Sequence, residues 1–578
     1  MQEHPMTNAD IVQFFSNIAD LLDIKGEEWY RIRAYRRAAE EIAHYPEDLT
    51  TLQQEGRLEE IPGVGKAIAA KIDEMLSTGR LEFYERLKSE IPDGVLSLLG
   101  IPGVGPRTVS LLYHELGLVS IPDVEIAAQQ QRLRNLKGLG AKSEQRILQG
   151  IQMLHRISGR HLLATALPVA EQIVAALRDC PSAHNVSPAG SLRRCAPTVG
   201  DIDILAASTQ PQEVVDYFVS LPQVAEVSSH GDTKATVYLE NGLQVDLMVL
   251  EDAHYGSLLQ HFTGSKDHNA ALRGLARRQN LSLSEYGFQH HDGTITSCPT
   301  EEEVYATLGL EWIPPELREA RGELEAAQQH RLPHLLVAAD IKGDLHTHTV
   351  YSDGGHTVEE MAREARARGY EYIAITDHSQ GLGVAGGLSP EDFARQQAEI
   401  AAVNDRLAPF RVLSGVELEI KTDGALDLPD EILAQFDIVV ASVHLGLSQE
   451  EEQMTGRMIA AMRSPHVDII AHPTGRLLGQ RDRVTLDFEA IVKEAARTGT
   501  MLEVNAQPNR LDLDGDLARR AIGDGVKLAL GSDAHHAEGL GVLRFGVATA
   551  RRGWAEPSDV VNTLSCEELL AGLNGGHT

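Results

Sequence analysis

The chain has 578 residues, of which 42% are hydrophobic and 24% charged, as in globular proteins with several domains. Its formal net charge of −32 excludes a protein that coats nucleic acid non-specifically, so any contact with DNA has to be local. There is no membrane-spanning apolar run, no signal-peptide pattern, and no disulfide or metal-ligand spacing among the four cysteines. We therefore expect a cytoplasmic protein without membrane contact.

The N-terminal part is predicted to be helical from residue 7 to about residue 90, because apolar residues such as Phe14 and Ile18 recur at helical spacing. It also contains a basic run at residues 30–37. This run and a second arginine cluster at residues 273–278 are candidates for a local DNA contact, although each taken alone could be a solvated helix face.

A glycine-containing turn motif recurs in this region. Ile-Pro-Gly-Val-Gly stands at residues 61–65 and again at 101–105, and a weaker copy, Leu-Lys-Gly-Leu-Gly, stands at 136–140. Glycines between two helices let the backbone approach a phosphate, with N–H groups of the next helix pointing at it. The pattern resembles the helix-hairpin-helix motif, which binds the DNA backbone without reading bases. The glycines of the two stronger copies are the predicted DNA contacts: Gly63, Gly65, Gly103 and Gly105.

Three acidic residues characterise the next region. Asp201 and Asp203 are two apart on a predicted strand and project from one face, and Asp246 lies inside the next apolar strand. Carboxylates at this separation repel each other unless cations lie between them, as in two-metal phosphoryl-transfer sites. Upstream, a turn at residues 190–191 offers backbone N–H groups, and Arg194 offers charge to phosphates.

This order of motifs resembles the nucleotidyltransferase palm of family X DNA polymerases, of which DNA polymerase beta is the familiar member. The resemblance implies that the three aspartates hold two Mg²⁺ or Mn²⁺ ions and catalyse nucleotide addition. It also implies a set of palm residues that bind the incoming nucleotide: Arg160, Gly190, Ser191 and Arg194.

The run from His261 to Arg273 resembles the nucleotide-binding thumb of the same family. The resemblance implies that Phe262 and Gly264 pack against the sugar, that Asn269 meets the incoming base, and that Arg273 touches the template. One residue departs from the pattern, because His261 stands where the familiar members have a tyrosine that helps to exclude a ribose hydroxyl.

Lys71 lies on the helix that follows the first hairpin. The stretch from Ala34 to Leu87 is similar to the small N-terminal domain of DNA polymerase beta, in which a lysine at this position forms a Schiff base with an incised abasic sugar. Such a nucleophile needs a lowered pKa. A lyase nucleophile and a plain phosphate-contacting lysine both remain open for Lys71.

The second half of the chain begins after Pro314-Pro315 and a charged helical linker. Short apolar strands then alternate with helical segments, which predicts about seven βα units in a barrel short of a full ring. After an opening strand that precedes His346, the predicted strands are residues 372–376, 412–416, 438–443, 467–471, 501–505 and 527–531.

Histidine and carboxylate residues follow nearly every one of these strands. Active sites of such barrels form where the carboxyl ends of the strands converge. Histidine and carboxylate without cysteine suit Zn, Mn or Fe, and this many ligands implies a multinuclear cluster, which we expect to hold two or three Mn²⁺ or Zn²⁺ ions. The pattern resembles the PHP (polymerase and histidinol phosphatase) domain. The predicted ligands are His346, His348, Asp353, His378, Glu417, His444, His472, Asp533 and His535.

The expected fold is therefore a multidomain α/β protein with a helical helix-hairpin-helix region, an α+β palm and thumb, and a distorted (β/α)7 PHP barrel. The expected domains are a lyase-like DNA-binding region at 1–90, a fingers-like region at 91–155, the palm at 156–250, the thumb at 251–317, a linker at 318–339 and the barrel at 340–578.

The resemblance implies a bacterial DNA repair polymerase that adds dNTPs at gapped or primer-template DNA and carries a 3′→5′ exonuclease, with abasic-site endonuclease activity as an additional expectation. We expect a cytoplasmic monomer that joins the nucleoid when bound to DNA. Two alternatives are a small-molecule phosphatase such as histidinol phosphatase and a non-catalytic DNA scaffold. Three hairpins argue against the first, and the intact acid triad argues against the second.

Overall fold

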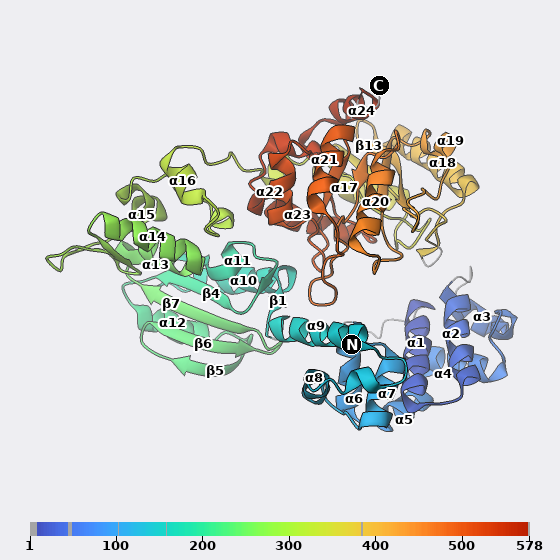
Figure 1. The fold of residues 1–578 in the computed structure, drawn as a ribbon. Coiled ribbons are helices and arrows are strands. Elements are labelled where there is room, and N and C mark those ends of the chain that lie inside the picture. The colour runs from blue at the N-terminus through green and yellow to red at the C-terminus, as the bar shows by residue number, and fades with distance from the viewer. Residues whose placement is uncertain (1–7, 44–48, 102, 158, 383–384, 576–578) are drawn as a thin grey trace. The chain divides into compact units, whose positions relative to one another are not determined.

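The computed structural model describes residues 8–43, 49–101, 103–157, 159–382 and 385–575 (Figure 1). The chain divides into two compact units, residues 1–158 and residues 159–578. Within the described ranges, no helix is long and apolar enough to cross a membrane.

The first unit is entirely helical in its described residues. Its α-helices are α1 (Asn8–Lys25), α2 (Trp29–Ala43), α3 (Leu49–Glu55), α4 (Lys66–Thr78), α5 (Glu82–Ser89), α6 (Asp93–Ser97), α7 (Pro106–Leu116), α8 (Ile121–Gln129) and α9 (Ala141–Ile157). One hydrophobic core runs through them, including Phe15 of α1, Ile72 of α4, Val109 of α7 and Ile151 of α9, all fully buried.

The three glycine turns fold alike. Each follows a short 3₁₀ helix, η1 (Leu58–Glu60), η2 (Leu98–Gly100) or η3 (Leu133–Asn135), and precedes α4, α7 or α9. The N–H groups of Val64, Val104 and Leu139 each donate to the carbonyl three residues earlier at 3.0 Å. The repeat seen in the sequence is therefore a repeat of backbone structure.

The palm is a five-stranded sheet with strand order β2-β4-β7-β6-β5. Helices α10 and α12 pack on one face, and α13 (Tyr255–Thr263) packs on the other against Leu205 and Ala207 (Figure 1). The elements are β1 (His161–Leu162), α10 (Leu163–Arg178), β2 (His184–Pro188), α11 (Gly190–Arg193), β3 (Thr198–Val199), β4 (Ile202–Ala207), α12 (Pro211–Val219), β5 (Val224–His230), β6 (Lys234–Leu239) and β7 (Gln244–Leu250).

The thumb combines helices with a small antiparallel sheet. Its elements are α13 (Tyr255–Thr263), α14 (Lys266–Arg278), β8 (Ser282–Ser284), β9 (Gly287–Gln289), β10 (Ile295–Thr296), α15 (Glu301–Thr307) and α16 (Glu323–Gln328). Glu301 lies in its centre and binds Arg193 of the palm and Arg318, which is fully buried. The segment predicted to be a linker, residues 318–339, thus begins with a buried arginine that belongs to this ionic network.

The remainder forms seven parallel strands paired in chain order, as the sequence predicts. They are β11 (Gly343–Asp344), β12 (Tyr372–Ile375), β13 (Arg411–Glu419), β14 (Ile438–Ser442), β15 (Ile469–Ile470), β16 (Met501–Asn505) and β17 (Leu528–Gly531). The helices that connect and follow them are α17 (Val358–Ala367), α18 (Pro390–Leu407), α19 (Asp430–Leu433), α20 (Glu451–Met462), α21 (Phe488–Thr498), α22 (Gly515–Gly523), α23 (Leu543–Arg552) and α24 (Cys566–Gly575).

The two ends of this sheet meet beyond β11 and β17. His348 N donates to Ala534 O at 2.9 Å, and Asp533 N donates to His346 O at the same distance. The sheet is therefore a nearly closed barrel, and the expected distorted (β/α)7 fold is confirmed. Leu511 and Phe545 of the barrel are buried in the hydrophobic core of the palm, so these two parts share packing within the second unit.

Candidate active sites in the palm and the barrel

Two neighbouring parallel strands carry the palm acids. Asp203 of β4 is paired in register with Asp246 of β7, and Asp201 comes one residue before β4 begins. Burial, together with the charges of the nearby Asp201 and Asp246 carboxylates, raises the pKa of Asp203 to about 7. Such mutual repulsion makes this group a natural binding place for cations.

Gly190 is shaped by its contact with Asp203. It has φ +61°, and a Cβ added to it would lie only 2.0 Å from Asp203 Oδ2. Ala189 N also donates to Asp203 O at 2.8 Å. A residue without a side chain is therefore required here, and the turn with Gly190 and Ser191 is held directly against the acidic site.

The two arginines expected at the triphosphate lie near the acids. Arg160 donates from Nε to Thr198 Oγ1 at 2.9 Å, and its charge lowers the pKa of Asp201, although burial, the larger effect, raises it. Arg194 donates to Thr263 O and lies 3.2 Å from Glu319 Oε1, and its charge opposes the rise in the pKa of Asp203.

The thumb residues surround the end of α13. Phe262 packs on the face of the sheet near Leu205. Gly264 lies against the Arg194 guanidinium, because a Cβ added to this glycine would lie 3.2 Å from Nη1 of Arg194. The Asn269 side chain donates to His261 O at 2.6 Å and accepts from Gln260 at 2.8 Å. Asn269 has to exchange these bonds if it is to meet a base.

Lys71 is half-buried on α4. Its Nζ lies 5.1 Å from the centre of the Phe83 ring and 3.2 Å from Ala67 O. Burial lowers the pKa of Lys71, and the charges of Arg31 and Arg86 lower it further, whereas Glu74 acts in the opposite direction. This environment increases the fraction of neutral amine, which a Schiff-base nucleophile needs.

The hairpin glycines repeat closely. Gly63 and Gly103 have φ +82° and +80°, and Gly65 and Gly105 cap α4 and α7 with φ/ψ of −89°/174° and −92°/173°. Both pairs of glycines leave the start of a helix open to a phosphate, because no added Cβ at Gly65 or Gly105 would meet any described atom within 4 Å.

The barrel brings all nine of its expected ligands to the carboxyl ends of its strands. Three groups of them place one ligand atom each within 4.8 Å of one another: His348, Asp353, His378 and His535; His346, His348 and Asp533; and His378, Glu417 and His444. The ninth, His472, lies 3.0 Å from Glu417 Oε1.

Glu417 stands at the centre of this cluster. Burial would raise its pKa, but His346, His378 and His444 hold it well below the usual range. Nε2 of His346, Nε2 of His348 and Nδ1 of His378 make no hydrogen bond with any described residue, although each lies 3.1–3.5 Å from the Glu417 carboxylate. Buried nitrogens without a partner are costly, and cations would satisfy them, so the residues fit a multinuclear metal centre.

Two residues that orient these ligands were not predicted from the sequence. Glu503 of β16 accepts from His346 Nδ1 at 2.7 Å, and Glu419 of β13 lies 3.0 Å from His444 Nδ1. Both are buried. The signal that could have found them is an acidic residue inside an apolar strand, the same signal that singled out Asp246.

Comparison with known proteins finds family models for several parts of the chain and relatives of known name. Family models match at residues 6–81 (helix-hairpin-helix domain), 95–153 (SAM-like helix-hairpin-helix tandem), 258–319 (DNA polymerase beta thumb) and 344–507 (PHP domain). A probable phosphatase of Thermoanaerobacter sp. (strain X514) is 31% identical over 231 residues, which are 38% of this chain and 89% of that protein. DNA polymerase lambda of Rattus norvegicus is 24% identical over 54% of this chain and 56% of its own length.

A palm, a thumb and a histidine-rich barrel in one chain define a polymerase of the beta type joined to a PHP domain. The DNA polymerase/3′-5′ exonuclease PolX of Bacillus subtilis (strain 168) is 38% identical over 571 residues, which are 98% of this chain and 99% of that protein. The chain belongs to this family of PolX-type DNA polymerase/3′-5′ exonucleases. The expected family and enzyme class are confirmed.

Proposed function

We propose that the chain extends primer 3′ ends at short DNA gaps in the palm and removes nucleotides from 3′ ends in the barrel. The observation that carries the polymerase half is the register of Asp203 with Asp246 on neighbouring strands, with Gly190 against the Asp203 carboxylate. This arrangement supports the binding of two divalent cations, Mg²⁺ or Mn²⁺. When bound, they would activate the primer 3′-hydroxyl and offset negative charge on the triphosphate.

The residues of the palm would position the other groups. Ser191 and the backbone of the 190–194 turn would contact the phosphates, with Arg160 and Arg194 adding charge. Phe262 and Gly264 would bound the sugar, and Arg273 would contact the template.

In the barrel, the nine ligands would hold two or three Mn²⁺ or Zn²⁺ ions that supply Lewis acidity for hydrolysis of a phosphodiester. Arg510 adds a positive charge at the edge of this centre, with Nε 3.8 Å from Asp533 Oδ2, and would contact the scissile phosphate. Val350 and Leu445, each about half exposed, flank the ligands His348 and His444 in the chain and offer apolar surface to a nucleobase. Such surface fits a 3′-terminal nucleotide better than a small polar phosphate ester.

Two variants test whether the sites are separate. Asp203→Ala should lose gap filling by several orders of magnitude and keep 3′→5′ degradation, whereas His346→Ala should lose degradation and bound barrel metal and keep gap filling. Loss of both activities in Asp203→Ala would contradict two independent sites. Hydrolysis of histidinol phosphate faster than degradation of DNA by the wild type would favour the small-molecule phosphatase instead.

A further inference from the structure

The loop that connects β15 to α21 carries a second positive group near the ligand cluster of the barrel. Its central part, residues 474–484, folds back on itself: Val484 N donates to Thr474 O at 2.8 Å, and the backbones of Leu477 and Arg481 exchange two hydrogen bonds of 2.8 Å. The backbone of Arg481 is therefore held in a defined position, although it lies in a loop.

This 474–484 loop is tied to the segment that carries Arg510. Leu478 N donates to Asn509 O at 2.6 Å, and Nε of Arg476 donates to Arg510 O at 2.7 Å. Arg510 in turn lies beside the cluster, with Nε 3.8 Å from Oδ2 of the ligand Asp533. The ligand cluster, Arg510 and the 474–484 loop are thus neighbours in that order.

The charge of Arg481 has no carboxylate partner. Its Nε donates to Gly475 O at 2.7 Å, and its two terminal nitrogens make no hydrogen bond or ion pair among the described residues. Burial lowers the pKa of Arg481, and the positive charge of Arg510 lowers it further, whereas Asp512 acts in the opposite direction. Two guanidinium groups that repel each other, one of them with free donors, favour an anion that both can contact.

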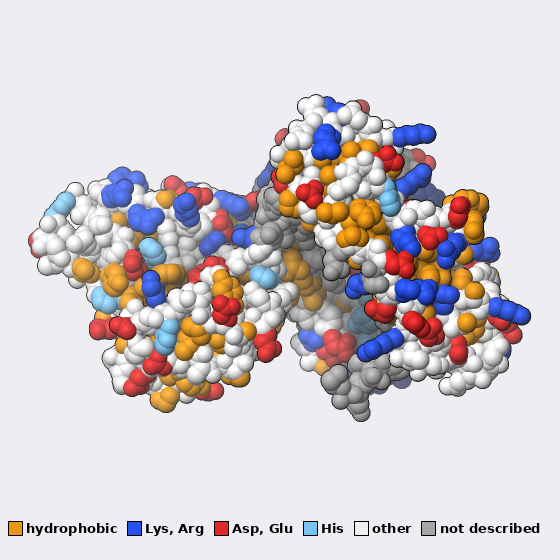
Figure 2. Space-filling view, turned by 90° about the horizontal axis from the view of Figure 1, so that it is seen from below, with side chains coloured by type: hydrophobic (Ala, Val, Ile, Leu, Met, Phe, Trp, Pro, Cys, Tyr) orange, Lys and Arg blue, Asp and Glu red, His pale blue; other side chains and the backbone are white. Residues whose placement is uncertain are grey.

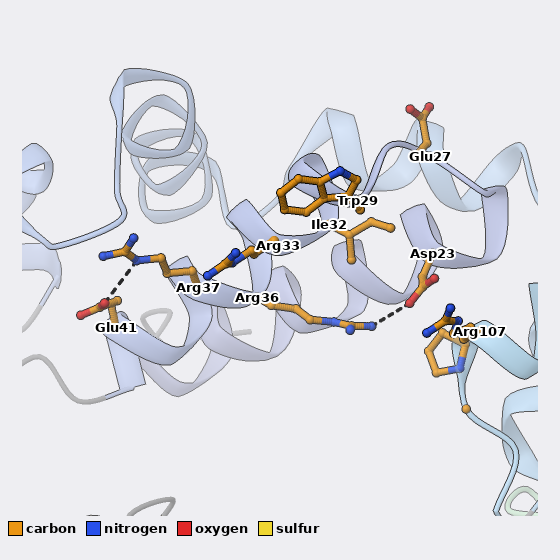
Figure 3. A pocket seen from close by; sticks show the side chains of 11 residues that line it. Asp23, Glu27, Trp29, Ile32, Arg33, Arg36, Arg37, Glu41 and Arg107 are labelled. Carbon is orange, nitrogen blue, oxygen red and sulfur yellow. Dashed lines mark hydrogen bonds and ion pairs between the residues drawn. The ribbon is translucent and has the colours of Figure 1, made fainter.

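Other arginines of the chain can also meet DNA, and their charges are paired. On the face shown in Figure 2, basic side chains of the N-terminal unit stand among acidic and hydrophobic ones. In a cleft along α2, Arg36 is paired with Asp23 at 2.9 Å and Arg37 with Glu41 at 3.4 Å (Figure 3). Because that unit offers cations of its own, the affinity for a long strand does not report on Arg481 alone. Hydrolysis of a very short substrate does.

We propose that Arg481, next to Arg510, binds the phosphate one nucleotide inward from the bond that the barrel cleaves. The inference rests on the proposed nuclease function of the barrel, in which Arg510 contacts the scissile phosphate. A guanidinium can bind a phosphate through two parallel N–H groups, and both terminal nitrogens of Arg481 are available for this. The contact exists only in a substrate with at least two phosphodiesters. Arg481 therefore makes the barrel select a DNA strand over a single phosphate ester.

Two substrates separate this subsite from the scissile position. Hydrolysis of dTpdTpdT adds water across the terminal P–O3′ bond and gives dTMP and dTpdT, while the other phosphodiester stays intact as the inward phosphate. The p-nitrophenyl ester of thymidine 5′-phosphate also gives dTMP but has no inward phosphate. In the full chain with Mn²⁺, Arg481→Gln should lower kcat/KM for dTpdTpdT about tenfold and change it by less than about twofold for the nitrophenyl ester.

Arg483→Gln is the matched control. It removes the same charge from the same loop, at an exposed position where the arginine is already paired with Asp514, and it should leave both substrates unaffected. A methylphosphonate at the inward linkage of the trinucleotide supplies a second measurement that needs no variant. This neutral linkage should cost the wild type about tenfold in kcat/KM and cost Arg481→Gln nothing further, because the side chain that meets the inward charge is already gone.

Three outcomes would overturn the inference alone. These are equal rates of the wild type on dTpdTpdT and on its methylphosphonate analogue, equal losses of Arg481→Gln on the trinucleotide and the nitrophenyl ester, and equal behaviour of the Arg481 and Arg483 variants. Hydrolysis of the nitrophenyl ester that survives in His346→Ala would instead place the nuclease outside the barrel. That result would overturn the proposed function together with the inference.

Discussion

Glu319 links the arginine of the palm turn to the barrel. Its Oε1 lies 3.2 Å from Nε of Arg194 and 2.9 Å from Nη2 of Arg552, at the end of α23. Arg552 Nη1 also donates to the Arg194 carbonyl oxygen at 2.6 Å. One guanidinium of the barrel thus contacts both the backbone of Arg194 and the carboxylate that holds its side chain.

This relationship gives an expected effect on nucleotide binding. Glu319 competes with a triphosphate for Arg194, and Arg552 weakens that competition by sharing the carboxylate. Arg552→Gln should raise KM for dNTP about fivefold, the effect of roughly 1 kcal/mol, whereas Glu319→Gln should lower it. Steady-state gap filling measures both.

Arg551→Gln provides the matched control, because Arg551 binds Glu316 at 2.8 Å at the same interface without touching Arg194. Equal changes in KM for the Arg551 and Arg552 variants would attribute the effect to the interface as a whole.

Lys71 can be tested by trapping. If it is the Schiff-base nucleophile, borohydride should cross-link the protein to an incised abasic site, and Lys71→Ala should abolish the cross-link. Because its pKa is lowered, the rate of trapping should reach its plateau at a lower pH than an ordinary lysine would require. Lys66→Ala, five residues earlier on α4, is the control. Trapping that survives in Lys71→Ala and disappears in Lys66→Ala would move the chemistry to Lys66.

Short motifs made much of this architecture predictable. Residues two apart on a strand share a face, and side chains after parallel strands converge at one end of a barrel, so local spacing was enough to group Asp201 with Asp203 and His346 with His348. The three hairpins were recognisable because each contains a copy of the same five-residue motif. Strand ends shifted slightly, since β4 begins at Ile202, after Asp201.

Other features depend on contacts between residues far apart in the chain. Glu503 and His346 are 157 positions apart, and Arg552 and Arg194 are 358 apart, and no local pattern pairs them. The buried position of Arg318 was equally hidden, because arginine near a proline-rich linker is ordinarily exposed. Tertiary packing decides such pairs, and sequence periodicity does not report it.

Glu503 should control metal affinity in the barrel. Its Oε1 accepts from His346 Nδ1 and its Oε2 accepts from His472 N, both at 2.7 Å, which leaves His346 Nε2 facing the cluster. A glutamine cannot accept both bonds with one oxygen. Glu503→Gln should weaken metal binding about 10- to 100-fold and lower exonuclease activity at limiting Mn²⁺, with gap filling unchanged. Elemental analysis and Mn²⁺ titration measure these effects.

Glu494→Gln is the control for this change, because Glu494 binds Arg463 and Arg497 on the outer surface of the barrel. Wild-type metal content in Glu503→Gln would mean that the ligands hold the cluster without their buried partner.

Glu301 should make the thumb sensitive to acid. Burial alone would raise its pKa, but Arg318 and Arg193 lower it to about 2, against 4.5 for an ordinary glutamate. A depressed carboxyl pKa contributes stability that is fully present above pH 4.5 and is lost as the pH falls toward 2. Trp312 Nε1 donates to Glu301 at 3.0 Å, so the fluorescence of this tryptophan reports on the network.

Glu301→Gln should therefore destabilise the thumb by about 3–5 kcal/mol at pH 7, because it leaves Arg318 buried without a counter-charge. The difference in unfolding free energy between wild type and variant, measured in urea and followed by Trp312 fluorescence, should narrow as the pH falls from 4.5 toward 2, because Glu301 takes up a proton in the unfolded wild type before it does so in the folded one. Glu303→Gln, an exposed change on the same helix, should leave both stability and its pH dependence unaltered. A difference between wild type and Glu301→Gln that stays constant over this pH range would show that packing, and not the charge of Glu301, holds the thumb together.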